Sequence, residues 1–343
     1  MITIKKIAEL ANVSPGTVDR IIHNRGQVTQ ENIDKVNAII EKYEYKRNIF
    51  ASNLAFNKKF KIAVFLPNQK DLEYWKMPII GIEKAAKEYG NFGFTIDYFY
   101  YKYDSLSFKK SADKLLKLDY DGVLFAPIFY EESLFFLQEF QKKNGHAILI
   151  DSDIKEMPNK SYIGQDAYQS GFLSGKLLSI GLNNETTKLL VIKITREIEI
   201  TSIYLQRIKG FYSFFKNKKE FKNLKFDEIR IKESGKIELT KKMFQGVDSV
   251  FIPNSRAFIV ADFIKENKIE GIKIVGYDLL KRNVEHLNND VISFLINQNP
   301  EEQGFLGISH LYKKLVLKEE INPENYMPLE IIVKENLNIN KII

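Results

Sequence analysis

Residues 3–22 read TIKKIAELANVSPGTVDRII, and this stretch predicts two short helices joined by a tight turn. In the first helix the apolar residues follow the i, i+3, i+4, i+7 spacing of one buried face, and Thr3 is a suitable N-cap. Asn12 tolerates the left-handed backbone that the turn requires. Ser14 can cap the second helix, and Pro15 fits its first position, where the missing N–H is not needed. Helix, turn and helix form a helix-turn-helix, whose second helix enters the major groove of DNA.

A third helix is expected after Thr29, a suitable N-cap, and it would close a small core. The chain has 343 residues and a formal net charge of +7. Residues 1–60 hold ten basic and six acidic side chains, a net charge of +4. More than half of the positive excess therefore lies in about a sixth of the chain. This concentration suits a polyanionic partner better than an even excess of lysine would.

Composition excludes several classes of protein. No run approaches the roughly 18 apolar residues of a membrane helix, and the N-terminus lacks the uninterrupted hydrophobic core of a signal peptide. We therefore expect a cytoplasmic, unprocessed protein without a membrane partner. The chain has no cysteine, and its four histidines show no His-x-His or His-Glu-x-x-His spacing. Neither a metal site nor a cofactor is predicted.

Residues 13–20 read VSPGTVDR, which resembles the V-S-x-x-T-V-S-R signature of the LacI/GalR family of bacterial repressors. The similarity continues through residues 25–29 and through residues 45–55, where YKRNIFASNLA resembles the family's Y-x-P-N-x-x-A-x-x-L-A hinge segment. The resemblance implies a recognition helix from Pro15 to His23 and a hinge helix near residues 48–56 that folds when two subunits meet on operator DNA. Leu54 would then be a wedge in the minor groove, although an ordinary linker leucine packed on a core is the competing interpretation.

The side chains expected to contact DNA are Thr3, Ser14, Pro15, Gly16, Thr17, Arg20, His23, Asn24, Asn48, Ala51 and Leu54. Pro15 and Gly16 offer no side-chain hydrogen bonds, so base reading should shift to Thr17, Arg20 and His23. The usual serine of the signature is replaced by Asp19, which would repel a phosphate, accept from a cytosine amino group or orient Arg20; these alternatives stay open. In the hinge segment Ala51 must be small for paired helices to approach, and Arg47 replaces the family's proline.

After the linker, short aliphatic runs alternate with amphipathic stretches, which is typical of parallel sheets covered on both faces by helices. Strands are expected at 61–66, 94–99, 122–126, 147–150, 188–194, 226–231, 249–252, 273–276 and 292–296. Helices are expected at 77–90, 107–118, 131–143, 168–181, 200–217, 236–245, 256–266 and 301–317. So many units predict an α/β fold of two doubly wound parallel-sheet subdomains. The family resemblance implies that this part of the chain is similar in fold to periplasmic binding proteins.

The expected division of the chain has three parts. Residues 1–46 form the helix-turn-helix domain, 47–60 the hinge helix and linker, and 61–343 the ligand-sensing domain. Crossovers near 160–165, 290 and 322 would divide the sensing domain. Its N-subdomain would comprise about 61–162 and 291–322, and its C-subdomain about 163–290 and 323–343.

Ligands of such folds lie beyond the carboxyl ends of the strands, in the cleft between subdomains. Polar and aromatic side chains at those ends are the candidates for ligand binding: Asn68, Tyr74, Trp75, Asp151, Arg207, Asn254, Asp278 and Gln298. The carboxylates can each accept from two hydroxyls, and Arg207 offers a planar fork of donors. Trp75 supplies a flat face for a sugar ring or fills the core; both readings stay open. The family resemblance assigns its ligand contacts to Asp151, Arg207, Asn254, Asp278 and Gln298.

These features predict a ligand-responsive transcriptional regulator, a repressor that binds a pseudo-palindromic operator as a homodimer. The expected effector is a sugar or sugar derivative, with a neutral sugar slightly favoured over an acidic or phosphorylated one. No additional tetramerisation helix is apparent in residues 322–343, which favours a dimer. Whether the effector releases or promotes DNA binding is left open, because relatives of both kinds exist.

Two other classes share the expected cleft. A periplasmic sugar-binding protein would need a signal peptide and would not begin with a helix-turn-helix. An enzyme would need a phosphate loop or a nucleophile elbow, and neither G-x-x-x-x-G-K-[ST] nor G-x-S-x-G occurs in the sequence. Asp151 and Asp278 can mimic the carboxylate pair of a glycosidase, so a turnover assay separates that reading from simple binding. We expect no catalysis.

Overall fold

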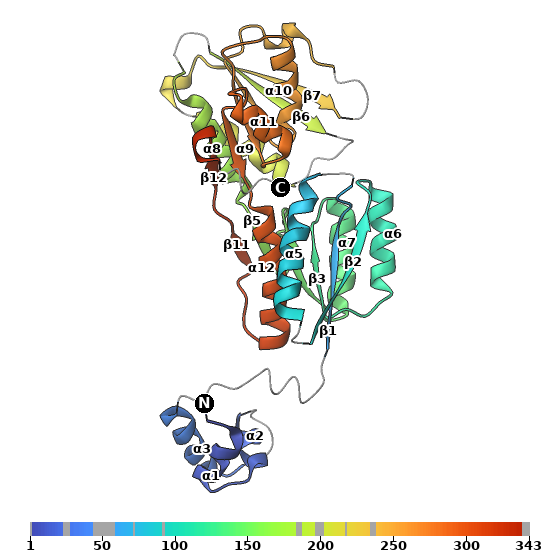
Figure 1. Ribbon diagram of the computed structural model, residues 1–343, viewed down its shortest axis with the longest axis vertical. Coiled ribbons are helices and arrows are strands. Elements are labelled where there is room, and N and C mark those ends of the chain that lie inside the picture. Colours follow the sequence, from blue (N-terminus) through green and yellow to red (C-terminus); the bar gives the residue numbers. More distant parts are fainter. Residues whose placement is uncertain are drawn as a thin grey trace. The chain divides into compact units, whose positions relative to one another are not determined.

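The computed structural model describes residues 2–22, 28–43, 59–70, 73–90, 93–182, 187–195, 202–216, 218–233 and 238–337. The chain divides into two compact units, Met1–Phe56 and Asn57–Ile343, which are each considered separately (Figure 1). No helix among the described residues is long and apolar enough to cross a membrane.

The N-terminal unit contains the predicted helix-turn-helix. Its helices are α1 (Ile4–Ala11), α2 (Pro15–Ile22) and α3 (Gln30–Lys42). The Thr3 side chain accepts from the backbone N–H of Lys6, and Asn12 has the left-handed φ of 53° that the turn was expected to need. Ser14 accepts from the backbone N–H of Thr17 at 3.1 Å. The prediction of a Thr29 cap was wrong in one respect, because Thr29 stands at the N-cap of α3 but its side chain makes no capping bond.

Six small or aliphatic side chains fill the core of this unit: Ile7, Ala8, Ala11, Val18, Ile21 and Val36. They come from all three helices, so the third helix closes the core as expected. Five predicted DNA contacts, His23, Asn24, Asn48, Ala51 and Leu54, lie outside the described residues together with most of the predicted hinge.

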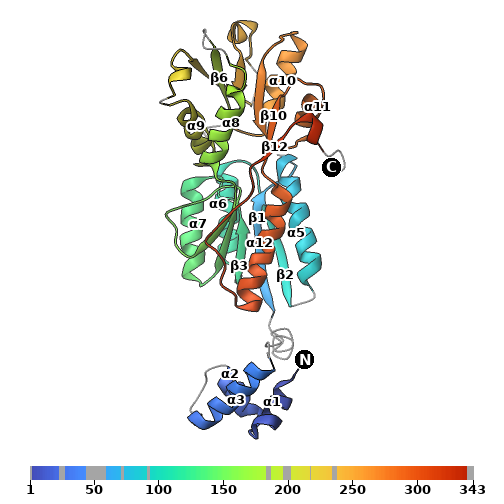
Figure 2. The same cartoon turned by 90° about the vertical axis from the view of Figure 1, so that its left-hand side faces the viewer.

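The larger unit consists of two lobes, each built on a six-stranded sheet (Figures 1 and 2). The sheet of the N-lobe has the order β11-β5-β4-β3-β1-β2, and all its strands are parallel. Its strands are β1 (Phe60–Pro67), β2 (Phe94–Tyr101), β3 (Gly122–Phe125), β4 (His146–Ile150), β5 (Lys160–Gly164) and β11 (Glu324–Tyr326). Helices α5 (Lys76–Tyr89) and α12 (Pro300–Tyr312) cover one face, and α6 (Ser105–Leu116) and α7 (Tyr130–Lys142) cover the other.

The C-lobe repeats this arrangement with the order β12-β10-β9-β8-β6-β7, except that β12 runs antiparallel to β10. Its strands are β6 (Lys188–Thr195), β7 (Lys225–Lys232), β8 (Ser249–Phe251), β9 (Lys273–Tyr277), β10 (Phe294–Asn297) and β12 (Glu330–Ile332). Helices α8 (Ala167–Ser179) and α9 (Ser202–Phe215) pack on one face, and α10 (Ala257–Glu266) and α11 (Lys281–Asn288) on the other, each pair over its own apolar cluster. Each face of the sheet is therefore buried, which is why its strands appear as aliphatic runs.

The same hydrogen bond occurs once in each lobe, at the start of its first strand. The backbone N–H of Lys61 donates to the carboxylate of Asp121, and that of Lys188 donates to Asp248, each at 2.8 Å and across 60 residues of sequence. Because equivalent strands occupy equivalent places, β4 of the N-lobe corresponds to β9 of the C-lobe. The residues that follow these two strands, Asp151 and Asp278, therefore occupy matching positions.

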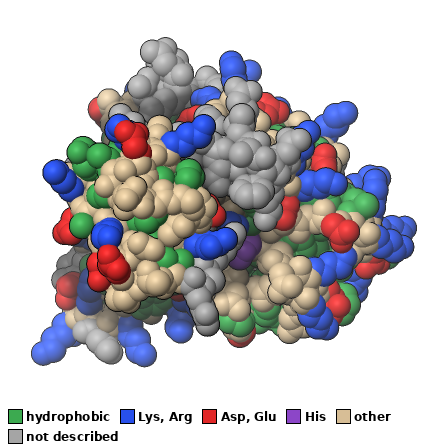
Figure 3. All heavy atoms as spheres, turned by 90° about the horizontal axis from the view of Figure 1, so that it is seen from below, with side chains coloured by type: hydrophobic (Ala, Val, Ile, Leu, Met, Phe, Trp, Pro, Cys, Tyr) green, Lys and Arg blue, Asp and Glu red, His purple; other side chains and the backbone are tan. Residues whose placement is uncertain are grey.

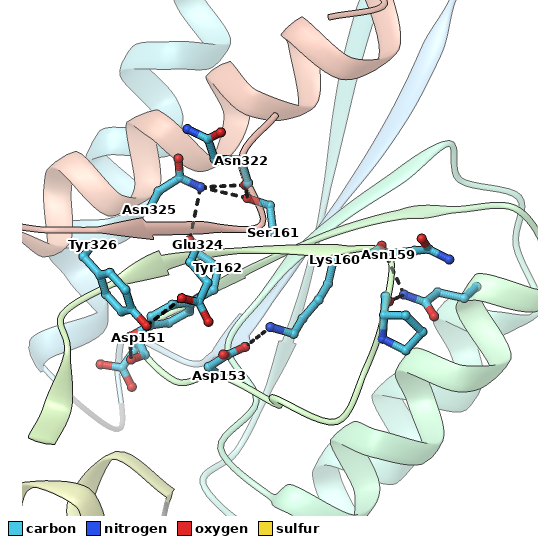
Figure 4. Close-up of polar contacts among 12 residues, drawn as sticks. Asp151, Asp153, Asn159, Lys160, Ser161, Tyr162, Asn322, Glu324, Asn325 and Tyr326 are labelled. Atoms are coloured by element: carbon cyan, nitrogen blue, oxygen red, sulfur yellow. Dashed lines mark hydrogen bonds and ion pairs between the residues drawn. The ribbon is translucent and has the colours of Figure 1, made fainter. Parts of the chain in front are cut away.

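Two of the three expected crossovers are displaced. β10 pairs with β9 in the C-lobe, so the chain returns to the N-lobe after Asn297 and not near 290. β11 pairs with β5 in the N-lobe, so the last crossover follows residue 326 and not 322. The reason is that both lobes use the same alternation of strand and helix, which does not reveal which sheet a strand joins. Figure 4 shows Asn325 of β11, whose side-chain amide donates to the hydroxyl of Ser161 on β5 and to the carbonyl of Asn322.

Other local elements also differ from the expectation. Strands β5, β11 and β12 and helix α11 were not predicted. The described part of the expected helix at 236–245 contains only a short 3-10 helix, Lys241–Phe244. Strands β11 and β12 have three residues each and are only partly buried, so they lack a strong hydrophobic period.

In each lobe one pair of helices packs with its backbones in close contact. A Cβ atom on Gly81 of α5 would lie 1.8 Å from the carbonyl oxygen of Glu301 on α12. A Cβ atom on Gly171 of α8 would lie 1.9 Å from the carbonyl oxygen of Arg207 on α9. Such distances leave room only for glycine, so these residues fix how the helices at the cleft lie against each other.

Candidate ligand-binding site

A pocket lies between the two lobes at the carboxyl ends of their strands. Its cavity volume is about 100 Å³, and it is open to solvent. Seven of the eight predicted ligand-binding residues line it: Tyr74, Trp75, Asp151, Arg207, Asn254, Asp278 and Gln298. The fold therefore brings these residues together from distant parts of the sequence, as expected for ligand-binding residues near the carboxyl ends of parallel strands.

Asn68 is the exception. Its side-chain oxygen accepts from the backbone N–H of Lys70 at 3.0 Å, in the turn that follows β1. Asparagine commonly stabilises turns in this way. The residue follows a strand end, but its side chain serves the turn and does not line the pocket.

On the N-lobe side, Asp151 is held by neutral donors. It follows β4 with a φ of 66°, and its carboxylate accepts from the Tyr74 hydroxyl at 2.9 Å. Burial raises the pKa of Asp151, while the charge of Arg207 opposes that increase. Burial, together with the neighbouring charge of Asp151, also raises the pKa of Tyr74 well above 10. Tyr74 therefore stays protonated and donates to the carboxylate.

Trp75 belongs mainly to the N-lobe core. Only 2% of its surface is exposed, and its ring meets that of Tyr74 edge to face with centroids 5.1 Å apart. Although Trp75 borders the pocket, too little of its surface is exposed for a sugar ring to stack on it. The core interpretation therefore describes its packing better than the stacking interpretation.

On the C-lobe side, a buried guanidinium organises the polar groups. Arg207 of α9 is 3% exposed, and its guanidinium carbon lies 3.7 Å from the centroid of the Tyr277 ring. It donates to the carbonyl of Pro253 at 3.1 Å and to the side-chain oxygen of Gln298 at 2.5 Å. The Tyr277 hydroxyl is held in turn by Ser170 and Ser174. The guanidinium is thus fixed by a cation–π contact and by hydrogen bonds before any ligand arrives.

The second carboxylate of the pocket, Asp278, receives the amide of Gln298. The Gln298 nitrogen lies 2.9 and 3.0 Å from the two carboxylate oxygens. Burial, together with the charge of Asp151, raises the pKa of Asp278 to about 7 against the opposing effects of Arg207 and Gln298. Near neutral pH this carboxyl group therefore exchanges readily between an acceptor and a donor form.

Asn254 is largely occupied by the protein itself. Its amide donates to the carbonyl of Ile194 at 2.7 Å, and its side-chain oxygen accepts from the backbone N–H of Arg256 at 3.1 Å. Arg256 is paired with Glu233. Asn254 therefore shapes the loop after β8 and keeps one amide hydrogen for another partner.

Several lining residues were missed, among them Tyr103, Thr195, Tyr204 and Arg256. Thr195 ends β6, so the strand-end rule that selected Asp151 applies to it equally. Tyr204 precedes Arg207 by three residues on α9, so helical spacing places both on one face. Tyr103 follows β2 by two residues, so the same rule could have selected it, whereas no such signal distinguishes Arg256.

The assembled groups suit a small ligand with several hydroxyls. Two carboxylates and two arginines line the pocket beside aromatic and aliphatic side chains. Acceptors face it from both lobes, and the fixed guanidinium is a donor. Among the described residues, no group of histidine, cysteine, aspartate and glutamate side chains has the arrangement of a metal site.

In the N-terminal unit, the described DNA-contact candidates lie on the outer side of the helix-turn-helix. Thr3, Ser14, Pro15, Gly16 and Arg20 are exposed, and Thr17 is partly exposed with its hydroxyl 2.9 Å from that of Ser14. On the face drawn in Figure 3, lysine and arginine side chains are interspersed with aspartate and glutamate. Among the described residues of the unit, Lys6 pairs with Glu9 and Lys35 with Glu31.

Comparison with known families agrees with both units. The family described as "Bacterial regulatory proteins, lacI family" matches residues 3–48, and the family described as "Periplasmic binding protein domain" matches residues 62–319. The chain carries a lacI-family domain in its N-terminal unit and belongs, over most of its length, to the periplasmic binding protein family. Its larger unit is a periplasmic binding protein domain, as the sequence resemblance implied.

Individual relatives support both assignments at moderate identity. The "Probable HTH-type transcriptional repressor ExuR" of Bacillus subtilis is 27% identical over 170 residues, and the match spans only about half of either chain, 48% in each case. The "Ribose operon repressor" of Lactococcus lactis is 23% identical over 294 residues, 81% of each chain. A crystal structure from Bacteroides fragilis, assigned as a LacI transcriptional regulator, superimposes with a TM-score of 0.74 at 27% identity, covering 81% of this chain and 98% of that one.

Proposed function

We propose that the protein is a ligand-responsive transcriptional regulator, a repressor that binds a pseudo-palindromic operator as a homodimer and senses a sugar or sugar derivative. The observation that carries the sensor assignment is the fixed group of Arg207, Gln298 and Asp278 facing Asp151 across the pocket. Such convergent polar groups in a pocket between lobes are typical of small-molecule sites. A regulator of this kind acts in the cytoplasm, where its DNA is.

The DNA-binding part of the proposal is supported by the helix-turn-helix and by the lacI-family domain. The sugar is supported by the chemistry of the pocket and by the ribose operon repressor, a relative named for a sugar. Two acceptors and a planar donor suit hydroxyl groups. Because the two carboxylates and the two arginines of the pocket already balance one another, a neutral sugar fits better than an acidic one.

The mechanism follows from where the groups lie. Asp151 belongs to the N-lobe, whereas Asp278 and Arg207 belong to the C-lobe, so a ligand bonded to both sides favours one arrangement of the lobes over others. The ligand changes operator affinity only to the extent that it binds the two arrangements with different affinity. A hinge helix at residues 48–56, outside the described residues, would transmit the change. Both signs of response, release and recruitment, are compatible with this scheme.

Trp75 offers a direct test of the sensor assignment because it is the only tryptophan of the chain and borders the pocket. Its fluorescence is measured while D-ribose, D-galactose, D-glucuronate, a hexose phosphate and guanine are added in turn. We expect a saturable change with one class of sugar, and a Trp75→Phe variant tested by calorimetry excludes optical artefacts. If no sugar alters the fluorescence or releases heat, the sugar-sensor proposal is wrong.

DNA binding is tested separately with an operator selected from random duplexes. Arg20→Ala, on the exposed side of α2, should weaken binding to that operator strongly, because an arginine contact to a base contributes about 1–3 kcal/mol. Lys35→Ala is the control, since Lys35 lies on α3 and pairs with Glu31. If both variants bound the operator with equal affinity, Arg20 would not be a contact to DNA. Assaying the bound sugar for chemical conversion distinguishes a sensor from a sugar-active enzyme that uses the same two carboxylates.

A further inference from the structure

The two carboxylates of the pocket share an unusual backbone conformation. Asp151 has a φ of 66° and Asp278 a φ of 67°, both in the left-handed region. Residues other than glycine rarely adopt it, and they keep it only when their surroundings hold them there. Each carboxylate is therefore placed by whatever holds its backbone.

The C-lobe holds Asp278 through its own sheet. The N–H of Asp278 donates to the carbonyl of Ile296 on the neighbouring strand β10 at 3.0 Å. Its carbonyl accepts from the buried amide of Asn283 at 3.1 Å, and Asn283 also donates to the carbonyl of Tyr277. Every one of these partners belongs to the C-lobe.

The N-lobe holds Asp151 differently. The N–H of Asp151 donates to the side-chain oxygen of Gln303 at 2.9 Å, so a side chain on α12 replaces the strand backbone. The carbonyl of Asp151 accepts from the Tyr162 hydroxyl at 3.1 Å, a pair drawn in Figure 4. The same Gln303 amide donates through its nitrogen to the carbonyl of Gln298 at 2.8 Å.

These bonds form one continuous path between the carboxylates. Gln303 connects the backbone of Asp151 to Gln298, which lies just after β10, where the chain crosses between lobes. The Gln298 side chain then contacts Asp278 and Arg207. Gln303 is only 1% exposed and is not among the residues that line the pocket.

We propose that Gln303 is a positioning residue of the sensor: it couples the backbone of Asp151 to the crossover residue Gln298 and so sets the distance between the two carboxylates that receive the sugar. This inference rests on the proposed sensor function. The role needs one acceptor and one donor on a neutral, buried side chain, which an amide supplies. Removing both leaves a buried N–H and a buried carbonyl without these partners, and Asp151 loses the contact that holds its left-handed backbone.

The first experiment compares Gln303→Met with Gln141→Met. Methionine keeps the side-chain length and removes both hydrogen bonds. Gln141 is the control because its amide also donates to two backbone carbonyls of the N-lobe, those of Pro158 and Asn159, and none of these three residues lines the pocket. For whichever of D-ribose, D-galactose or D-glucuronate alters Trp75 fluorescence in the wild type, Gln303→Met should weaken affinity about tenfold or more. Gln141→Met should leave the affinity within about twofold of the wild type.

A readout without sugar makes the test independent of the effector's identity. Trp75 touches Tyr74, and Tyr74 bonds Asp151, so a displaced Asp151 should change the emission maximum of Trp75 and its quenching by acrylamide. We expect this change in Gln303→Met and not in Gln141→Met. Identical emission and quenching in all three proteins would overturn the inference. Absence of any sugar response in the wild type would instead count against the proposed function.

A second variant separates positioning from simple core packing. In Gln303→Glu the introduced carboxyl is buried, so it is protonated at low pH and then supplies both an acceptor and a donor. At higher pH it ionises and loses the donor to Gln298. Gln303 bonds Asp151 directly and is connected through Asp151 and Gln298 to Tyr74, Asp278 and Arg207. Each measurement is therefore referred to the wild type at the same pH. Sugar affinity and Trp75 emission should match the wild type near about pH 5 and depart from it near about pH 8. A deviation that is the same at both pH values would contradict positioning by this amide.

Discussion

The N-lobe and the C-lobe have the same strand order, yet each stabilises its pocket carboxylate with different chemistry. In the C-lobe, Asp278 lies beside a guanidinium that is stacked on Tyr277 and is bonded by Gln298. In the N-lobe, Asp151 is bonded by the neutral hydroxyl of Tyr74. The charge of both carboxylates is therefore balanced mainly from one side, by Arg207, which lowers the pKa of each against the effect of burial. Equivalent positions in a repeated fold need not carry equivalent electrostatics.

The largest effect should follow from removing that shared charge. Arg207→Met leaves the buried carboxylate of Asp278 and the partly buried carboxylate of Asp151 without their guanidinium. It should lower the free energy of unfolding by about 3–5 kcal/mol and abolish the sugar response. Urea denaturation measures the loss. Arg230→Met, at an exposed position on β7, should cost less than about 0.5 kcal/mol. Because protonation neutralises the carboxylates, the Arg207→Met deficit should shrink as pH falls. A deficit that does not change with pH would mean that packing, and not charge, determines the role of Arg207.

The helix pairs provide a comparison in which the lobes should behave alike. Gly81→Ala in the N-lobe and Gly171→Ala in the C-lobe each place a Cβ atom within 2 Å of a backbone oxygen, 1.8 and 1.9 Å respectively. Both should lower the free energy of unfolding by about 3 kcal/mol, because two helices must separate. Gly90→Ala is the control, since nothing lies within 4 Å of a Cβ atom there and its φ is −58°. A marked difference between Gly81→Ala and Gly171→Ala would show that one lobe yields more easily than the other.

Most of the fold could be predicted from the sequence because buried parallel strands and their covering helices have distinct patterns of apolar residues. The runs 61–66 and 188–194 are mostly aliphatic, and each forms the first strand of its lobe. The strands that escaped detection, β11 and β12, are short and only partly buried. Helix α11 is mostly polar over Lys281–Asn288, so its inward residues, such as Val284 and Leu287, are too few to form a clear stripe.

The candidate site was predictable to the extent that it depends on strand ends. Asp151, Asp278 and Gln298 follow strands and meet in the pocket, whereas Asn68 follows a strand and instead stabilises a turn. Hydrogen bonds between distant side chains leave no local trace in a sequence. The bond from Asp151 to Gln303 spans 152 residues and depends on a crossover that was placed incorrectly. Its role therefore emerges only from the structure.

The pKa values give a pH test of the C-lobe carboxylate. Because the pKa of Asp278 is raised from 3.8 to about 7, the folded state binds a proton between these values that the unfolded state has lost. This contribution to stability is complete below about pH 4 and is lost as pH rises through about 7. Asp278→Asn, neutral throughout, lacks it. From about pH 5 to about pH 8 the wild type should lose roughly 2.5 kcal/mol relative to the variant in urea denaturation. If the free energy of unfolding of the wild type and that of Asp278→Asn changed with pH in the same way, the pH-dependent loss would come from another group. Asp151 would be the next candidate, since burial raises its pKa too.

The smallest effect is expected on the N-lobe side, where only a neutral hydrogen bond is at stake. Tyr74→Phe removes the hydroxyl that donates to Asp151 at 2.9 Å and keeps the ring against Trp75. It should lower the free energy of unfolding by about 1 kcal/mol. Tyr120→Phe is the matched control, because the Tyr120 hydroxyl donates to Asp97 at the same 2.9 Å but in an exposed position, where water replaces it. If Tyr74→Phe cost as much as Arg207→Met, the two lobes would contribute equally to holding the carboxylates, and the asymmetry inferred from Arg207 would be wrong.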